Sequence, residues 1–432
     1  MFQNRAVLIK VGSLLYRNAS IRDLNGIKQC AQLYSSKSGE TKLLTQLTQR
    51  IKTVGPITVA DYMKEVLTNP VAGYYMSKDV FGSSGDFTTS PEISQMFGEL
   101  LAVWVIYEWT QLGSPEKLQV VELGPGRGTL ADDMLRVFKQ LQHVAKDAVS
   151  LHLVEVSPKM SAMQEAKLTG AATSEGSDAE TNPNMDGIPY RTAISQTGVP
   201  VSWYTHISQV PKGFSCFIAH EFFDALPVHK FQKTDKGWRE VMVDIDEGDG
   251  PHHLRFVLAP GPTIASKVFT KQDNEKRDHV EICPQAGVIT QEMAARIEED
   301  GGMGLIVDYG HDGTKTDTIR GFKKHALHDV LSEPGTADLT ADVDFSYIRE
   351  MVQQSVCTFG PVNQNLFLQQ MGIETRLKKL LTTQPEQHKE LISGYRMLMD
   401  PEQMGQRFKM FSLMPKNRAD GSPYNPAGFA IT

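Results

Sequence analysis

Two stretches of this sequence place glycines, acids and aromatic side chains at spacings that suit chemistry. In the first, residues 119–129, Glu122 precedes Gly124, Gly126 and Gly128. Its apolar first half predicts a strand buried on both faces, and the apolar residues at three- and four-residue steps that follow predict a helix. A glycine turn between a strand and a helix lets a ligand approach backbone N–H groups that a side chain would shield. The stretch therefore predicts a cofactor-binding loop, with a plain tight turn as the alternative.

The spacing of this loop distinguishes between two classes of cofactor. Dinucleotide-binding loops use G-x-G-x-x-G and place a pyrophosphate at the helix N-terminus. The spacing here is E-x-G-x-G-x-G, which resembles motif I of the class I S-adenosylmethionine (AdoMet) methyltransferases. AdoMet carries an ammonium and a sulfonium, so a carboxylate such as Glu122 would be favoured beside it. Glu155, near the end of the next expected strand (151–156), could accept the ribose hydroxyls, although taken alone it would more often be a solvated charge.

The second stretch follows another expected strand, residues 214–219, and reads His220-Glu221-Phe222-Phe223-Asp224. In open α/β sheets the ligand crevice lies beyond the carboxyl ends of the strands. Glu221 and Asp224 could clamp a planar guanidinium there by charge-assisted hydrogen bonds, and one phenylalanine could stack on it. The alternative is that both acids cap a helix and both phenylalanines lie in the core.

Further polar residues are expected at the same crevice. The strand expected over residues 303–311 ends in Asp308, Tyr309 and His311. His311 could take up the proton released after methylation, or could be a hydrogen-bonded structural histidine. The loop 82–89, which contains Asp86, could form a lid over the cofactor or simply lead into the next helix. We count Asp86 and His220 among the cofactor-binding candidates.

Bulk properties narrow the class of protein. A net charge of −7 over 432 residues argues against a general nucleic-acid binder. No apolar run is long enough for a membrane span, and the four cysteines form no C-x-x-C pair. Residues 1–39 are basic, contain serine and are almost free of acids, which is typical of a mitochondrial transit peptide. A disordered basic tail is the alternative.

The remaining chain predicts an α/β fold, a class I AdoMet-dependent methyltransferase core of the Rossmann-like type. We expect a helical region with the lid loop over 40–117, the AdoMet-binding core over 118–335, and a C-terminal α/β region over 336–432. A hairpin signal at 234–237 indicates a β-rich substrate-binding insertion near 228–283 that would sit over the crevice. Three acids between 338 and 344 lack the glycine and distal glutamate of a calcium loop and are interpreted as a helix start, so no metal is expected.

Several segments occur together and in order that resemble the MidA family of mitochondrial protein arginine methyltransferases. They are residues 73–75, 85–93, 122–128, 221–227, 308–310 and 339–345. The resemblance runs from about residue 40 to the C-terminus and is more specific than motif I alone. His220 is a departure, because bacterial relatives more often carry asparagine at that position.

The resemblance implies symmetric dimethylation of an arginine on the 49-kDa type subunit of respiratory complex I, in the mitochondrial matrix, during assembly of that complex. It implies a protein partner and no nucleic acid, and it leaves a homodimer open. Two other functions are compatible with the residues: an assembly chaperone that keeps AdoMet only as a structural ligand, and a small-molecule methyltransferase.

Overall fold

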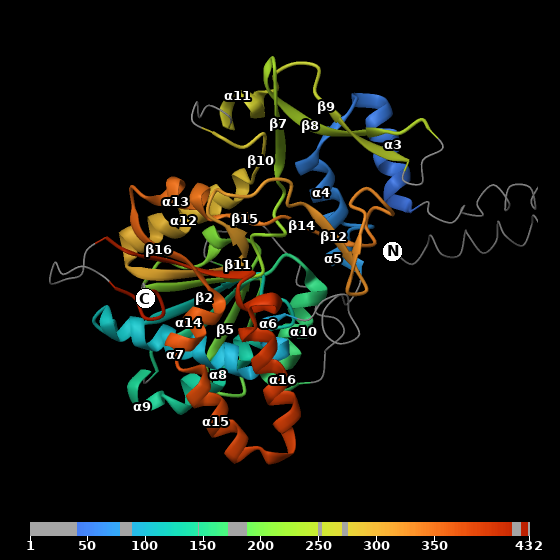
Figure 1. Cartoon of the computed structure of the whole chain (residues 1–432). Coiled ribbons are helices and arrows are strands. Elements are labelled where there is room, and N and C mark those ends of the chain that lie inside the picture. Colours follow the sequence, from blue (N-terminus) through green and yellow to red (C-terminus); the bar gives the residue numbers. More distant parts are fainter. Residues whose placement is uncertain are drawn as a thin grey trace, which may run out of the picture.

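The computed structural model describes residues 41–77, 89–145, 147–171, 188–248, 253–269, 275–416 and 425–430. Its centre is one large twisted sheet (Figure 1). The strands of this sheet, in spatial order, are β16 (Val356–Asn363), β17 (Phe408–Pro415), β11 (Gly302–His311), β6 (Ser215–His220), β2 (Leu118–Leu123), β3 (Val149–Val154), β5 (Pro200–Tyr204) and β4 (Arg191–Ile194), with β15 (Val343–Asp344) beside β11.

The strand order places a crevice at the middle of the sheet. Strands β11, β6, β2, β3 and β5 are parallel, whereas β17 and β4 run antiparallel to their neighbours. From β2 the chain moves outward through β3 to β5 and then returns to β6 on the other side of β2. This reversal is the topological switch point of an open α/β sheet, beyond whose carboxyl ends ligands bind. The expected α/β fold is confirmed.

Helices cover both faces of the sheet, and the apolar residues of β2 are buried on both of them. On one face, Leu118 and Val120 pack in the cluster that contains α7 (Gln95–Gln111) and α8 (Thr129–Gln140). On the other face, Val121 and Leu123 pack in the cluster that contains α12 (Pro284–Asp300) and α13 (Phe345–Val352). Strands buried on both faces lose the polar alternation of half-exposed strands. The remaining helices of this unit are α9 (Gln142–Ala145), α10 (Pro158–Thr169), η1 (Ile207–Gln209), α14 (Gln364–Gln370), α15 (Ile373–Thr383), η2 (Pro385–Gln387), α16 (His388–Met399) and η3 (Pro401–Gly405).

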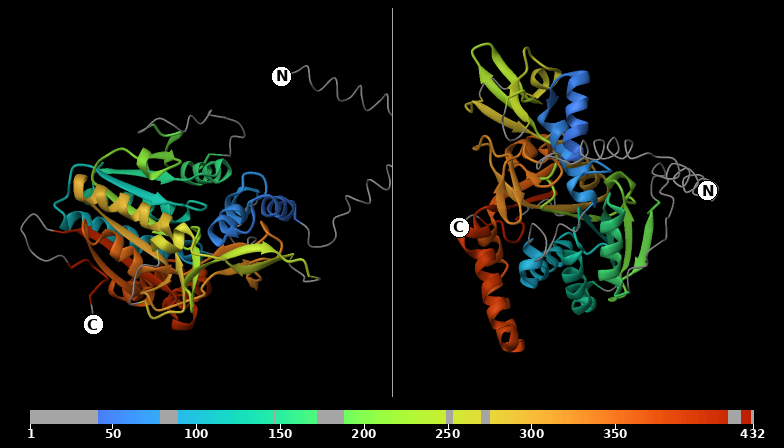
Figure 2. Two further views of the ribbon diagram at one scale, coloured as in Figure 1. Left: turned by 90° about the horizontal axis from the view of Figure 1, so that it is seen from above. Right: turned by 90° about the vertical axis from the view of Figure 1, so that its right-hand side faces the viewer.

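A second, smaller unit lies beside the carboxyl end of the central sheet (Figure 2). Its sheet contains β1 (Ile57–Thr58), β7 (His229–Thr234), β8 (Gly237–Ile245), β9 (Leu254–Leu258) and β10 (His279–Ile282), with the short helix α11 (Ile264–Phe269). The hairpin of β7 and β8 is the one that the turn residues predict. Apolar side chains of α3 (Lys42–Val54) and α4 (Val59–Thr68) form one cluster with those of β8 and β9. The N-terminal helices and the insertion therefore fold around a shared core.

Hydroxyl side chains cap the starts of several helices. Thr58 and Ser157 each accept a backbone N–H at the start of α4 and α10. The helical segment that begins at Ser90 is interrupted: the turn α6 (Ser90–Ile93) ends where Ser94 is extended (φ −159°) and caps α7. The acids at 338–344 do not form one helix start, because two short strands occupy that segment and only Asp344 caps α13.

A third sheet completes the crevice wall. It contains β13 (Ala326–His328), β12 (Arg320–Lys323) and β14 (Asp338–Thr340), and it faces the short helix α5 (Tyr74–Ser77). In the described ranges no helix is long and apolar enough to cross a membrane. The expected transit peptide, most of the lid loop including Asp86, and the polar segment 172–187 lie outside the described residues.

Candidate active site

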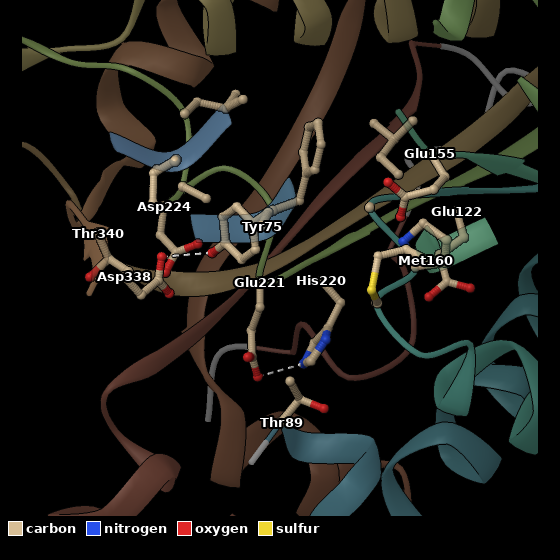
Figure 3. A pocket seen from close by; sticks show the side chains of 18 of the residues that line it. Tyr75, Thr89, Glu122, Glu155, Met160, His220, Glu221, Asp224, Asp338 and Thr340 are labelled. Atoms are coloured by element: carbon tan, nitrogen blue, oxygen red, sulfur yellow. Dashed lines mark hydrogen bonds and ion pairs between the residues drawn. The ribbon is translucent and has the colours of Figure 1, made fainter. Parts of the chain in front are cut away.

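A pocket of about 920 Å³ opens at the carboxyl ends of β2, β3, β5, β6 and β11, where the strand order predicts the crevice. Figure 3 shows its polar side chains in three groups. Glu122 and Glu155 lie on one side, His220 and Glu221 near the centre, and Asp224 with further acids on the other side. None of the described residues of the 228–283 insertion lines it, so a substrate-binding role for those strands stays a prediction.

The glycine loop has the backbone that its sequence predicts. Gly124, Gly126 and Gly128 have φ of +64°, +51° and +77°, which is the left-handed region. A Cβ at Gly124 would lie 2.7 Å from the ring of Phe222, whereas one at Gly126 would meet nothing within 4 Å. Gly126 therefore borders open space in the pocket. Gly128 does not line the pocket and instead provides the N-cap of α8.

Glu122 gives the strongest indication that the pocket binds a cationic ligand. The residue is 3% exposed, and burial raises the pKa of its carboxyl from 4.5 to about 8. Its Oε2 is buried without a hydrogen-bond partner among the described residues, although the side chain lines the pocket. A buried carboxylate needs a counter-charge or donors. The ammonium group of AdoMet supplies both, so this residue fits the cofactor that the loop predicts.

Glu155 is held in place by the start of α10. Its Oε1 accepts the backbone N–H of Ser157 at 2.7 Å, and its Oε2 accepts the side-chain amide of Gln164 at 3.0 Å. The same amide donates to the carbonyl oxygen of Gly126 at 2.7 Å, and the Gln164 oxygen accepts the indole N–H of Trp203. Gln164 thus ties the glycine loop to the acid of the second strand. The sequence pattern did not single it out.

The turn after β6 is built around the carboxylate of Asp308, a residue that the sequence places near the crevice without showing that it accepts hydrogen bonds from this turn. Oδ2 of Asp308, on β11, accepts the backbone N–H groups of Phe222, Phe223 and Asp224 at 3.2, 2.9 and 3.2 Å. Asp308 is fully buried and lies behind the pocket rather than on its lining. It fixes the turn that presents Glu221, whose φ of +50° is unusual for a non-glycine residue.

Glu221 and His220 lie side by side at the middle of the pocket. Oε1 of Glu221 lies 3.3 Å from Nε2 of His220 and accepts the backbone N–H of Ser90 at 3.3 Å. Burial lowers the pKa of His220 to about 3, and burial with repulsion from Asp224 raises the pKa of Glu221 well above 4.5. At neutral pH the histidine is therefore uncharged, and Glu221 binds a proton more strongly than an exposed carboxyl does.

Asp224 lines the same pocket and is 6% exposed. Burial raises the pKa of its carboxyl, and the nearby guanidinium of Arg320 partly opposes this rise. Arg320 itself pairs with Asp342 at 2.6 Å and lies over the ring of Tyr309. The pocket thus brings Glu221 and Asp224 together, as the sequence predicts, but neither of them caps a helix.

Besides Gly128 and Asp308, a third predicted residue, His311, is absent from the pocket lining. His311 is buried beside it, and its Nδ1 accepts the backbone N–H of Thr314 at 3.2 Å, which is the structural alternative stated above. Asp86 lies outside the described residues. Conversely, Tyr75 and Asp338 line the pocket although the sequence did not mark them as site residues. Among the described residues, no group of His, Cys, Asp or Glu side chains is arranged to hold a metal ion.

The doubly wound sheet, the left-handed glycine loop and the acids beyond β2 and β3 define an AdoMet-binding α/β methyltransferase site. Residues 100–362 match the model of a family described as "Putative S-adenosyl-L-methionine-dependent methyltransferase". The chain therefore belongs to this methyltransferase family, and its cofactor is S-adenosylmethionine.

Curated relatives match almost the whole chain. A protein of Xenopus tropicalis named "Protein arginine methyltransferase NDUFAF7, mitochondrial" is 53% identical over 400 residues, covering 92% of this chain and 91% of that one. The human protein of the same name is 55% identical over 388 residues, covering 89% and 86%. A Drosophila melanogaster protein named as its homologue is 47% identical over 386 residues, covering 88% and 86%.

A solved structure shares the fold. A Burkholderia thailandensis protein crystallised with S-adenosyl-homocysteine superposes with a TM-score of 0.72 at 24% identity, covering 90% of this chain and 94% of that one. At that identity the likeness concerns the fold alone.

Proposed function

We propose that this protein transfers a methyl group from AdoMet to a guanidinium nitrogen of an arginine in a protein substrate. The observation that carries the proposal is a pair of carboxyls in the pocket that also holds the glycine loop: that of Glu221, whose side chain is 18% exposed, and that of the buried Asp224. Burial raises the pKa of both, and repulsion from Asp224 raises that of Glu221 further. A cation between them would relieve the repulsion, and a planar guanidinium offers five donors for two carboxylates. The names of the relatives point to the same substrate class.

When bound, AdoMet supplies an electrophilic methyl group, so the task left to the chain is largely positioning. Glu221 and Asp224 would bind the guanidinium and turn one nitrogen toward the cofactor side of the pocket, where Glu122 and Glu155 lie. The attacking nitrogen must lose one proton as its new bond to carbon forms. In its ionised form Glu221 can accept that proton, because burial raises its pKa and makes it a stronger base than an ordinary carboxylate.

We further propose the finer function that the family resemblance implies. The product would be symmetric dimethylarginine on the 49-kDa type subunit of complex I, formed in the mitochondrial matrix during assembly of the complex. Relatives named as mitochondrial proteins and the basic, acid-poor residues 1–39 support this location. A homodimer stays a prediction.

The test separates cofactor binding from catalysis. Glu221→Gln and Asp224→Asn should bind AdoMet in calorimetry like the wild type, and should lose at least about a hundredfold in methyl transfer to the 49-kDa subunit, because each removes charge-assisted bonds made to the substrate. Asp312→Asn is a matched control, since that acid pairs with Arg349 at the surface, 2.7 Å away and outside the pocket.

Two outcomes would contradict the proposal. A wild-type protein that binds AdoMet and the 49-kDa subunit but transfers no methyl group would support the chaperone function. Transfer to small amines with no transfer to protein would support the small-molecule methyltransferase.

A further inference from the structure

The wall of the pocket opposite the cofactor loop contains an acid that the proposed function has not used. Asp338, on β14, is 5% exposed and lines the pocket. Its Oδ1 accepts the hydroxyl of Tyr75, on α5, at 2.8 Å. The two residues are 263 positions apart in the sequence, so this contact joins the N-terminal helices to the C-terminal part of the crevice. Figure 3 shows Asp338, Tyr75 and Asp224 gathered on one side of the chamber, across from Glu221.

We propose that Asp338 is a substrate-binding carboxylate, which pairs with one edge of the arginine guanidinium while Glu221 pairs with another, and that Tyr75 positions it. This inference rests on the proposed function and names a residue that determines its specificity. A guanidinium has several edges that each match a carboxylate, whereas an ammonium is a compact point charge. Two carboxylates on separate walls would therefore favour arginine over lysine.

The electrostatics of the pocket support the pairing of a guanidinium with Asp338 and Glu221. Asp338 contributes to the rise in the pKa of Glu221, so the two carboxyls are close enough to repel each other. The hydroxyl of Tyr75 is a neutral donor, because burial and the neighbouring Asp338 and Asp224 raise its pKa well above 10.0. A neutral donor fixes the orientation of Asp338 without cancelling its charge.

Both residues of the pair are held rigidly by their surroundings. Asp338 is opposite Phe322 in the pairing of β12 with β14, and the backbone N–H of Ala341 donates to the carbonyl oxygen of Asp224 at 2.9 Å. Tyr75 packs edge-on against Tyr74, with ring centroids 5.2 Å apart, and Tyr74 is fully buried in the core of the N-terminal helices. The N-terminal helices therefore form part of the pocket wall that would contact the substrate, in addition to packing against the insertion.

The variants Asp338→Asn and Tyr75→Phe test the assignment, with Tyr62→Phe as the matched control. Tyr62 is also a buried tyrosine of the N-terminal helices, and its hydroxyl donates to the carbonyl oxygen of Val330 at 2.8 Å outside the pocket lining. Tyr62→Phe thus removes the same atom and a hydrogen bond of the same length. Any effect of general loosening should appear in the control as well.

The readout is the binding of two small probes to the full chain saturated with S-adenosyl-homocysteine: N-acetyl-arginine amide and N-acetyl-lysine amide. We expect the wild type to prefer the arginine probe. Asp338→Asn should weaken binding of the arginine probe about 10- to 100-fold, because a charge-assisted hydrogen bond is lost. Tyr75→Phe should weaken it about 3- to 10-fold, because the Asp338 carboxylate is no longer held in its orientation. Tyr62→Phe should leave the preference unchanged, and AdoMet affinity should be unchanged in all three.

Methyl transfer to the 49-kDa subunit gives the second measurement, in which Tyr75→Phe should raise KM more than it lowers kcat. Unchanged binding of the arginine probe to Asp338→Asn, or equal losses in Tyr75→Phe and Tyr62→Phe, would overturn the assignment. Those results would leave the proposed function intact as long as the wild type methylates arginine. A wild type that binds the arginine probe but methylates no arginine would instead refute the proposed function.

Discussion

Substitution of Glu122 by glutamine should affect protein stability and cofactor binding in opposite directions. In the folded protein burial raises the pKa of Glu122 from 4.5 to about 8. Below about pH 4.5 both the folded and the unfolded state hold the proton, so the group contributes nothing to stability there. As the pH rises toward 8 the unfolded state loses the proton and the folded state keeps it, so the free energy of unfolding falls. The loss is complete above about pH 8.

The size of the stability loss follows from the difference between the pKa of Glu122 in the unfolded state and that in the folded state. One pH unit is worth about 1.4 kcal/mol for one proton, so the penalty at high pH is on the order of 3–5 kcal/mol. The residue is 3% exposed, so solvent screens little of this penalty. Glu122→Gln cannot ionise, and we expect it to be more stable than the wild type without ligand at about pH 8.5, with a difference that shrinks toward about pH 5.

Cofactor binding should respond in the other direction. The ammonium of AdoMet favours the ionised carboxylate, so wild-type affinity should rise by up to about tenfold per pH unit between about pH 6 and 8, with release of a proton. Glu122→Gln should bind about 10- to 100-fold more weakly at about pH 8.5, and its affinity should not rise over this interval.

Chemical unfolding and calorimetry at several pH values measure both effects. Glu108→Gln is a suitable control, because Glu108 is 1% exposed and accepts the backbone N–H of Ala427 at 2.7 Å, away from the pocket. The reasoning is refuted if Glu122→Gln gains no stability as the pH rises, or if wild-type affinity for AdoMet is independent of pH.

The other predictions concern the glycine loop, the turn after β6 and His311. Gly126→Val should abolish AdoMet binding measured by calorimetry at a stability cost of only about 1–2 kcal/mol, since its side chain would enter open space from a left-handed backbone. Gly124→Ala should lower the unfolding temperature more, because its Cβ would meet Phe222 at 2.7 Å; equal losses in the two variants would contradict this. Asp308→Ala should cost about 3 kcal/mol or more in chemical unfolding, together with methylation activity, because three buried backbone N–H groups would lose their acceptor. His311→Gln should leave methylation within about twofold of the wild type in a transfer assay, because residues outside a pocket rarely contribute to the reaction step; a large loss of kcat would restore its predicted catalytic role.

Features that depend on residues close together in the sequence could be predicted from it. The glycine loop, the strands at its two sides and the caps at Thr58 and Ser157 are all encoded within a few positions. By contrast, β16 contains the pair Gly360-Pro361, and a proline argues against a strand even though the register shift between Phe359 and Val362 accommodates it. The local sequence pattern therefore does not predict β16, because the proline that argues against a strand lies at an irregularity within it.

The partners within the site could not be predicted for a related reason. Asp308 meets the turn after β6 from 84 to 86 positions away, and Gln164 meets Gly126 from 38 positions away. No periodicity or spacing links residues that only the order of strands brings together. His311 shows a further limit of such reasoning, because a residue at the end of a central strand need not line the pocket, and its catalytic role stays a prediction.

The acids on the substrate side of the pocket affect one another's pKa values and must be considered together. Repulsion from Asp224 raises the pKa of both Glu221 and Asp308, and Asp338 raises that of Glu221 further. Buried like charges of this kind destabilise a fold unless they hold protons or meet a cation. An arginine side chain would lower each pKa, so its binding should release protons in proportion to the carboxyls that it contacts. A neutral acceptor would leave the repulsion in place, which is why this chamber suits a guanidinium better than an uncharged amine or hydroxyl.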